Sequence, residues 1–214
     1  MTDDAAPPDS GFTALVRSRR MVRRFTEGPV PTDLVEGIVR LGLRAPSAGF
    51  SQGWDFVVLD DAVARQRFWA ATSDADTEPD SWLRGVGAAP VLILCCSDKQ
   101  RYLHRYAEPD KPWQDGSDEH WPTPYWDVDT GMAAMIMLLA ATDVGLGSLF
   151  FGVPGERITA VLDAFDIPTD RRLVGVIALG WPAESVPSGS TRVRKRREVS
   201  EVVHRNRFGS NSGQ

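Results

Sequence analysis

The segment from Trp126 to Asp143 constrains the fold more than any other part of this 214-residue chain. It has the length of a helix, and its side chains are apolar around nearly the whole helical circumference. Such a helix is buried all round, either in a large core or at a subunit interface. Its longest apolar stretch, Met132 to Ala141, is only about half of the roughly 20 residues that a bilayer-spanning helix needs. The segment therefore predicts a protein with a sizeable core and no membrane span.

Shorter segments on either side of it follow the spacing of helices and strands. The predicted helices are Phe12–Ser18, Pro31–Leu43, Ala62–Ala71 and Ser81–Val86, and the predicted strands are Phe56–Leu59, Val91–Cys96, Leu146–Phe151 and Leu173–Leu179. A hydrophobic content of 42% over 214 residues is enough to build one core. We therefore expect a single domain over residues 11–208, between a disordered N-terminal tail (1–10) and a C-terminal tail (209–214).

Two adjacent cysteines, Cys95 and Cys96, lie inside one of the predicted strands. Neighbouring side chains of a strand point to opposite faces of the sheet, so this pair suits neither a disulfide nor the CxxC spacing of a redox or zinc site. The acidic, proline-containing N-terminus lacks the basic stretch and apolar core of a secretory signal. These features predict a cytoplasmic protein, and the scattered histidines (His104, His120 and His204) predict no metal site.

A polar stretch from Asp98 to Pro124 shows neither helix nor strand spacing. A loop of this length inside a compact domain usually has a function of its own. The aromatic residues in it and just after it are Trp113, Trp121, Tyr125 and Trp126. We expect these rings to form a lid that stacks on a planar substrate. The alternative is that they only cover the core of a dimer.

Two basic clusters stand out in a chain whose formal net charge is −5. The first lies between Arg19 and Phe25, and its guanidinium groups are suited to binding phosphate through paired hydrogen bonds. The second, from Arg192 to Arg197, has the composition of a basic tail. Either cluster alone is compatible with a solvated surface. The acidic remainder of the chain argues against a nucleic-acid-binding protein.

Two segments of small residues connect predicted helices to predicted strands. The first, Ala45 to Trp54, is either a plain connection or a loop whose backbone amides approach a planar ligand. In the second, Gly145 to Gly152, the glycines allow close approach of the backbone to another surface. The order of helix, glycines and strand excludes the Rossmann and P-loop phosphate-binding motifs.

Taken together, in this order and spacing, these segments resemble the nitroreductase superfamily of FMN enzymes from about Phe12 to Phe208. The residues that match its arginine motif and its Ala-Pro-Ser loop are Arg19, Arg20, Arg23 and Phe25, then Ala45, Pro46, Ser47, Gln52 and Trp54. Its late Gly-Leu-Gly-Ser stretch and its basic C-terminal segment are also present. The resemblance implies an α+β fold, with a mostly antiparallel central sheet flanked by helices, and an intertwined homodimer.

The resemblance also implies roles for individual residues. The expected contacts to the FMN phosphate are Arg19, Arg20, Arg194 and Arg196, and the other expected cofactor contacts are Met21, Arg23, Pro46, Ser47, Arg84, Phe150, Phe151 and Gly152. Arg23 is expected at the N1/O2 edge of the isoalloxazine, where a cation stabilises the charge that reduction creates. Pro46 and Ser47 are expected from the other subunit, and the backbone N–H of Gly152 is expected to point at flavin N5.

The chemistry implied by the resemblance is transfer of hydride from NAD(P)H, through flavin N5, to a nitroaromatic, a quinone or a similar electron-poor small molecule. Three alternatives stay open. The chain could sequester FMN with little turnover, or use another reductant such as a deazaflavin. It could also resemble the flavin-fragmenting 5,6-dimethylbenzimidazole synthase, although that branch carries an Asp at the position of Met21. These motifs do not encode the physiological substrate, the choice between NADH and NADPH, or the pathway.

Overall fold

The structure is a computed structural model that describes residues 10–74, 78–183 and 194–210. The chain divides into two compact units, residues 1–183 and residues 184–214, and each is described by itself below. Most of the two predicted tails, 1–10 and 209–214, lies outside the described residues. The domain limits of 11 and 208 therefore stay a prediction.

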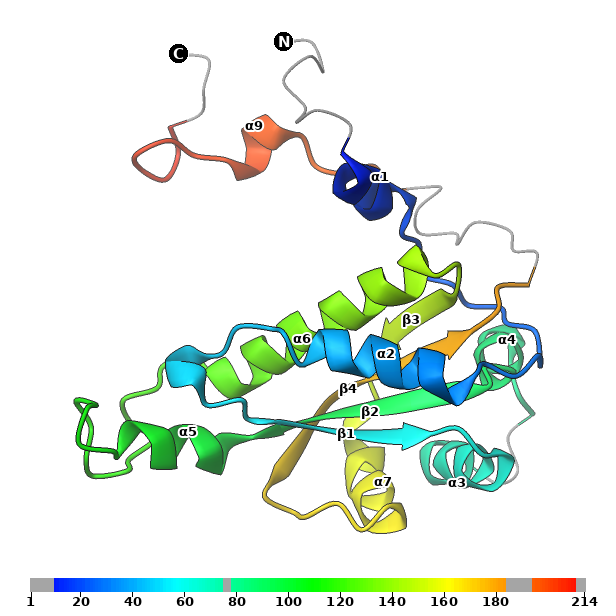
Figure 1. The fold of residues 1–214 in the computed structure, drawn as a ribbon, viewed down its shortest axis with the longest axis horizontal. Coiled ribbons are helices and arrows are strands. Elements are labelled where there is room, and N and C mark those ends of the chain that lie inside the picture. Colours follow the sequence, from blue (N-terminus) through cyan, green and yellow to red (C-terminus); the bar gives the residue numbers. More distant parts are fainter. Residues whose placement is uncertain (1–9, 75–77, 184–193, 211–214) are drawn as a thin grey trace. The chain divides into compact units, whose positions relative to one another are not determined.

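The larger unit is built on a four-stranded sheet with the strand order β1-β2-β4-β3 (Figure 1). Its strands are β1 (Trp54–Leu59), β2 (Val91–Asp98), β3 (Gly147–Phe151) and β4 (Arg171–Gly180). Every neighbouring pair is antiparallel, which confirms the predicted α+β fold with an antiparallel sheet. β2 is buried along its whole length because it lies between two strands and under helices on both faces. This position explains why its sequence is a continuous apolar run rather than an alternating one.

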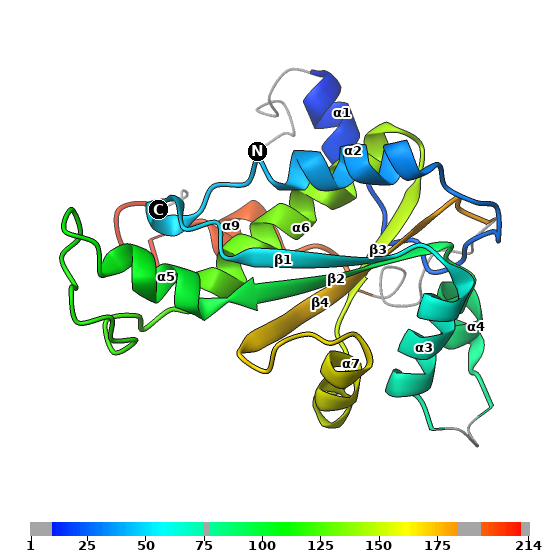
Figure 2. The ribbon, with the colours of Figure 1, turned by 60° about the horizontal axis from the view of Figure 1, so that its bottom comes forward.

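Helices cover both faces of the sheet (Figure 2). α2 (Thr32–Gly42) and α6 (Tyr125–Asp143) pack on one face, and α3 (Ala62–Thr72) and α7 (Ile158–Ala164) pack on the other. Cys95 belongs to the core on the α2/α6 face, whereas Cys96 belongs to the core on the α3/α7 face. The predicted divergence of the two thiols is thus confirmed, and both cysteines are free. Burial raises the pKa of the Cys96 thiol to about 11, which keeps it protonated at neutral pH.

Side-chain caps set the starts of several shorter helices. The hydroxyl of Ser10 accepts from the Thr13 N–H at the start of α1 (Gly11–Ser18), and the Asp80 carboxylate accepts from the Leu83 N–H at the start of α4 (Ser81–Gly87). Such caps satisfy amide groups that the first helical turn leaves unpaired. The remaining short helices are η2 (Ala48–Phe50), η3 (Gly155–Arg157) and, in the smaller unit, α9 (Val199–Val202).

The prediction that Asp98 to Pro124 lacks regular structure was wrong at its start. α5 (Lys99–Tyr106) begins directly after β2, with Asp98 as its N-cap. Only two of its side chains, Tyr102 and Leu103, are buried, so the apolar spacing is too sparse to reveal a helix in the sequence. α7, with seven residues, and α9, with four, were not predicted either.

The long helix α6 is not buried on all sides within one chain. Its inner face packs on the sheet, but an outer stripe of apolar side chains is exposed, with exposed fractions of 45% for Tyr125, 38% for Val128, 43% for Met132 and 39% for Met135. Their spacing of three or four residues places them on one side of the helix. Burial in the core of one chain therefore accounts for the inner face of this helix only, and the predicted burial all round is not seen within one chain. No helix in the described part of the chain is long and apolar enough to cross a membrane.

Candidate functional site

The arginine segment, residues Arg19 to Phe25, lies between the edge strand β3 and helix α4. Met21 pairs with Ser148 in a parallel bridge, and the N–H of Val22 donates to the Ser148 carbonyl at 2.9 Å. Further along, the N–H of Phe25 donates to the carbonyl of Gly85 in α4 at 3.4 Å. The segment thus runs beside the last strand of the sheet and is held mainly by its own backbone.

Two glycines make this close approach possible. A Cβ on Gly147 would lie 2.9 Å from Val22, and a Cβ on Gly85 would lie 2.3 Å from the carbonyl oxygen of Arg23. Real Cβ atoms essentially never come this close to a backbone atom. Gly147 belongs to the Gly-Leu-Gly-Ser stretch, so the expected close approach of that stretch to another surface is confirmed.

The arginine side chains of this segment have no acidic partners among the described residues. Arg20 donates to the backbone carbonyl of Arg19 at 3.0 Å and to that of Arg17, and Arg23 donates to the Met21 carbonyl at 3.2 Å. The Nη1 atom of Arg19 is buried and has no hydrogen-bond partner among the described residues. A buried, unpaired guanidinium nitrogen is costly, which makes Arg19 a candidate contact for an anion.

Arg84 and the end of β3 flank this segment. Arg84 is exposed on α4, and its guanidinium donates to the Pro79 carbonyl. Phe150 and Phe151 point to opposite faces of the sheet. The Phe150 ring packs against Gly175, so closely that a Cβ added there would be 2.3 Å from the ring. The Phe151 ring packs against Trp69 on the α3 side. Their side chains therefore do not line one surface, and Gly152, which follows them, is exposed.

The Pro46–Ser47 loop is held by a buried carboxylate. One oxygen of Asp129, a residue of α6, accepts from the Ala48 N–H at 2.9 Å and from the Tyr102 hydroxyl at 2.7 Å. Burial, together with the hydrogen bond to Asp129, raises the pKa of Tyr102 well above its usual range, so this hydroxyl remains a donor. The Oγ of Ser47 accepts from the Gln52 N–H at 2.9 Å, and Arg105 donates to the Gly49 carbonyl at 3.0 Å.

Asp129 was not identified from the sequence as a site residue. The available signal was a second carboxylate, two residues after Asp127, near the start of a helix that is mostly apolar. A charged side chain at such a position is buried only when it is hydrogen-bonded.

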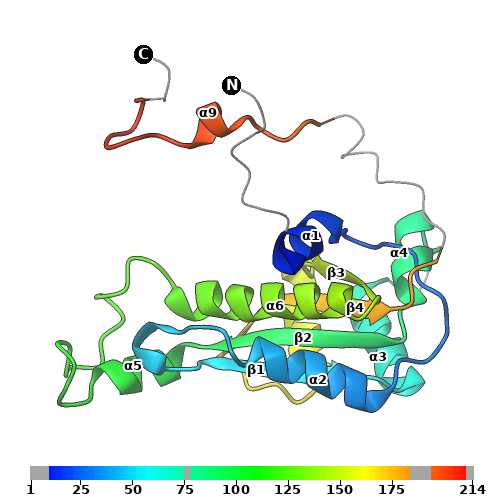
Figure 3. The ribbon, with the colours of Figure 1, turned by 45° about the horizontal axis from the view of Figure 1, so that its top comes forward.

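The predicted aromatic lid packs on α5. Trp121 lies 4.6 Å from Tyr106 and 6.0 Å from Tyr125 between ring centroids, and Trp113 stacks on Tyr106 at 5.3 Å. Trp126 is buried and contacts the Tyr102 ring at 6.1 Å. Within one chain these rings cover α5 and the start of α6, at the opposite end of the sheet from α3 and α4 (Figure 3).

The expected cofactor residues of the larger unit therefore form two groups. The arginine segment precedes the start of α2 and contacts α4 (Figure 3). Pro46 and Ser47 follow the end of α2, just before Gly49, whose carbonyl accepts from Arg105 of α5. The 11 residues of α2 alone span about 16 Å at 1.5 Å per residue. One chain therefore does not bring the two groups together, and the expectation that Pro46 and Ser47 serve another subunit stays a prediction.

The expected phosphate contacts of the C-terminal segment belong to the smaller unit. Arg194 and Arg196 are exposed, and neither forms an ion pair with any described residue. Their neighbour Arg197 pairs with Glu201, whose side chain closes a capping box with Glu198 at the start of α9. Arg192 lies outside the described residues. In the ranges that the structure describes, no group of three or more His, Cys, Asp or Glu side chains is placed to hold a metal ion.

Comparisons with known proteins agree with this arrangement. Similar proteins include an NADH dehydrogenase of Thermus thermophilus (30% identical over 186 residues, 78% of this chain and 84% of the relative) and a 5,6-dimethylbenzimidazole synthase of Rhodospirillum rubrum (30% over 192 residues, 83% and 84%). An NADPH-flavin oxidoreductase of Vibrio harveyi is 27% identical over 193 residues (90% and 72%).

The fold is shared with a solved FMN-dependent nitroreductase of Clostridium difficile, with a TM-score of 0.64 at 20% identity over 92% of this chain and 99% of that one. The profile of the nitroreductase family matches residues 16–181, a range that contains the arginine segment, the Ala-Pro-Ser loop and the whole sheet. On this match, and on a fold that agrees with it, the chain belongs to the nitroreductase family.

Proposed function

We propose that this protein is an FMN-dependent oxidoreductase that takes hydride from NAD(P)H and passes it to a small electron-poor organic molecule. The observation that carries the proposal is the arginine segment. Among the described residues its guanidiniums have no acidic partners, and one buried nitrogen of Arg19 has no hydrogen-bond partner. The family typically binds flavin, and the relatives named above include an NADPH-flavin oxidoreductase and an FMN-dependent nitroreductase.

The residues present fit an FMN phosphate and an isoalloxazine edge. Arg19 and Arg20 supply guanidinium donors that suit a phosphate, and we assign the same role to Arg194 and Arg196. Arg23 is partly buried and bonded only to a backbone carbonyl, so its charge remains available to a developing anion. When bound, FMN supplies an N5 atom that accepts hydride from a nicotinamide and passes it to an acceptor. The exposed N–H of Gly152 and the guanidinium of Arg84 orient that ring in our proposal.

The proposed active form is a homodimer. Pro46 and Ser47 lie too far along α2 from the arginine segment to serve the same cofactor in one chain. A second copy supplies them if the exposed stripe of α6, with Val128, Met132 and Met135, is buried between the subunits. The same arrangement gives the aromatic cluster on α5 access to the partner's cofactor, so its proposed role as a substrate lid also depends on the dimer.

The second candidate function is flavin fragmentation. The synthase from Rhodospirillum rubrum is as identical to this chain as the Thermus dehydrogenase is, at 30%. Its branch carries an Asp where this chain has Met21, whose side chain packs against the cores on both faces of the sheet. Because no carboxylate stands at that position, we favour hydride transfer to an external acceptor.

The test is the absorbance spectrum of the purified protein, followed by turnover. About one FMN per chain is expected, with steady NADH or NADPH consumption when a quinone or a nitroaromatic is added. Bound FMN that NAD(P)H does not reduce would favour sequestration or another reductant, which a panel of reductants under anaerobic conditions would distinguish. Release of 5,6-dimethylbenzimidazole from FMN would establish the second candidate. A colourless protein that fails to take up added FMN would overturn both.

A further inference from the structure

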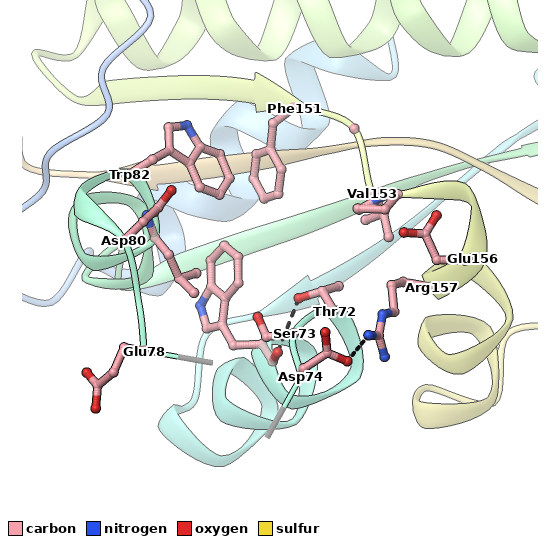
Figure 4. A pocket seen from close by; sticks show the side chains of 14 residues that line it. Thr72, Ser73, Asp74, Glu78, Asp80, Trp82, Phe151, Val153, Glu156 and Arg157 are labelled. Carbon is pink, nitrogen blue, oxygen red and sulfur yellow. Dashed lines mark hydrogen bonds and ion pairs between the residues drawn. The ribbon is translucent and has the colours of Figure 1, made fainter. Parts of the chain in front are cut away.

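A cavity of about 510 Å³ opens between the end of α3, the start of α4 and the segment that joins β3 to α7 (Figure 4). Its volume is within the range of small-molecule sites in proteins. Gly152, whose N–H we assign to the flavin, is part of its lining. We propose that this cavity binds a planar organic cation and so selects positively charged acceptors. The position of the flavin next to this cavity rests on the proposed function, whereas the binding of the cation does not.

The inner wall of the cavity is aromatic. Trp69 and Phe151 stack with their ring planes 8° apart and their centroids 5.9 Å apart, and Trp82 meets the Phe151 ring edge-on at 5.5 Å. Trp82 is 36% exposed, so part of its ring is open to a ligand. The faces of aromatic rings carry negative potential and attract organic cations, most strongly at tryptophan.

The charges around this wall are mainly negative. Glu78, Asp80 and Glu156 line the cavity and have no ion-pair partner among the described residues. The only cationic side chain among its lining residues, Arg157, is paired with Asp74, as Figure 4 shows. A cation entering the cavity therefore meets two carboxylates at the rim, those of Glu78 and Glu156, that have no ion-pair partner among the described residues, beside that of Asp80, which caps α4, and it meets aromatic faces inside.

The same arrangement disfavours anions. The phosphates of a pyridine nucleotide or of FMN would be repelled by the carboxylates at this rim. The arginines that we assign to the phosphate lie elsewhere in this unit, on the segment beside β3. Arg84 of α4 does not line the cavity, although its guanidinium donates to the carbonyl of Pro79 next to the rim. The phosphate site and the proposed cation site are thus distinguished by the sign of their charge, and each excludes the ligand of the other.

The experiment compares three planar ligands of similar shape: the cation 1-methyl-3-nitropyridinium, the neutral 3-nitrotoluene and the anion 3-nitrobenzoate. Their affinities for the purified protein are measured by calorimetry, without a reductant. The cation is expected to bind about tenfold more tightly than the neutral compound, and the anion more weakly than both. This preference should fall at high salt, because the carboxylates are exposed.

Two variants locate the effect. The double substitution Glu78→Gln and Glu156→Gln is expected to remove most of the preference for the cation, and Trp82→Leu is expected to weaken the cation's binding about tenfold. The matched control, Glu36→Gln with Asp163→Asn, removes two exposed carboxylates on α2 and α7 that do not line the cavity, and should leave the preference unchanged.

Equal affinities for the three ligands, or a preference that the control variant abolishes as well, would overturn the proposal. The outcome is independent of the proposed function. Cation binding by a protein without flavin turnover would refute the oxidoreductase and leave the cavity assignment standing. If the flavin turns over with the same three compounds as acceptors but shows no preference for the cation, the cavity assignment is refuted and the oxidoreductase stands.

Discussion

Charged side chains near α5 and those of the arginine segment beside α4 differ in the partners that they have. At the α5 end, Arg105 pairs with Asp110 and Glu108, Lys99 pairs with Asp118, and the buried Asp129 accepts two hydrogen bonds. At the α4 end, the backbone of the arginine segment is firmly held, while its guanidiniums have no acidic partners in the described part of the chain. Paired charges are typical of a scaffold, whereas unpaired ones indicate a place kept for a ligand.

The largest effect expected from this difference is on FMN binding. Replacing Arg19 and Arg20 together with Ala removes two charge-assisted contacts of roughly 1.5–3 kcal/mol each. FMN affinity should fall by about a hundredfold or more, as measured by titrating FMN into the apoprotein. The stability of the apoprotein should hardly change, because neither side chain has an acidic partner to lose in the ranges that the structure describes.

The control replaces Arg40 and Arg44, two exposed arginines of α2 and the turn that follows it, with Ala. It changes the net charge by the same amount, so it measures long-range attraction alone. Equal losses of affinity in the two double variants would mean that the arginine segment is an ordinary basic surface.

The next largest effect is expected at the α5 end and on stability rather than on binding. Asp129→Asn leaves the Tyr102 hydroxyl and the Ala48 N–H competing for one neutral oxygen and adds a buried amide donor without a partner. The free energy of unfolding should fall by about 2–4 kcal/mol, as measured by urea denaturation. Asp143→Asn, at the exposed end of the same helix, should change it by no more than about 0.5 kcal/mol. A comparable loss in both variants would remove the distinction between the two carboxylates.

A smaller effect tests how the arginine segment is held. Gly85→Ala places a methyl group 2.3 Å from the carbonyl of Arg23, so the segment has to move away from α4. We expect a loss of about 1–3 kcal/mol in the free energy of unfolding. Gly37→Ala in α2, where the added methyl group meets nothing within 4 Å, should instead stabilise the protein by about 0.5–1 kcal/mol. Tolerance of Ala at position 85 would show that the backbone there is not fixed by this contact.

The smallest effect concerns an exposed ion pair at the α5 end. The hydrogen bond from Arg105 lowers the pKa of Asp110 to about 2. A carboxyl whose pKa is lower in the folded state stabilises the protein above its unfolded pKa, near 3.9, and loses that contribution as the pH falls toward 2. Between pH 4 and pH 2 the wild type should therefore lose slightly more stability than Asp110→Asn does, as measured by acid denaturation. Identical acid profiles would show that solvent screens this pair completely.

Local patterns in the sequence were enough to predict most of the fold. Five helices and four strands were predicted at or near their observed positions, since the apolar spacing of helices and strands is a property of neighbouring residues. α5 escaped prediction because only Tyr102 and Leu103 bury apolar surface within it. The arginine motif and the glycines of the Gly-Leu-Gly-Ser stretch were likewise visible as candidate site elements, and the family match agrees with that interpretation.

Contacts between distant residues were decided only by the tertiary structure. Asp129 reaches partners 27 and 81 positions away in the chain, and no local pattern specifies such a pairing. The opposite orientations of Phe150 and Phe151 follow from the pleat, but which surface each one meets depends on Gly175 and Trp69. The sequence by itself therefore determined the elements and the residue types of the site. The packing of helices on the sheet decided which of those residues share an end of the molecule, because it joins segments that the chain keeps far apart.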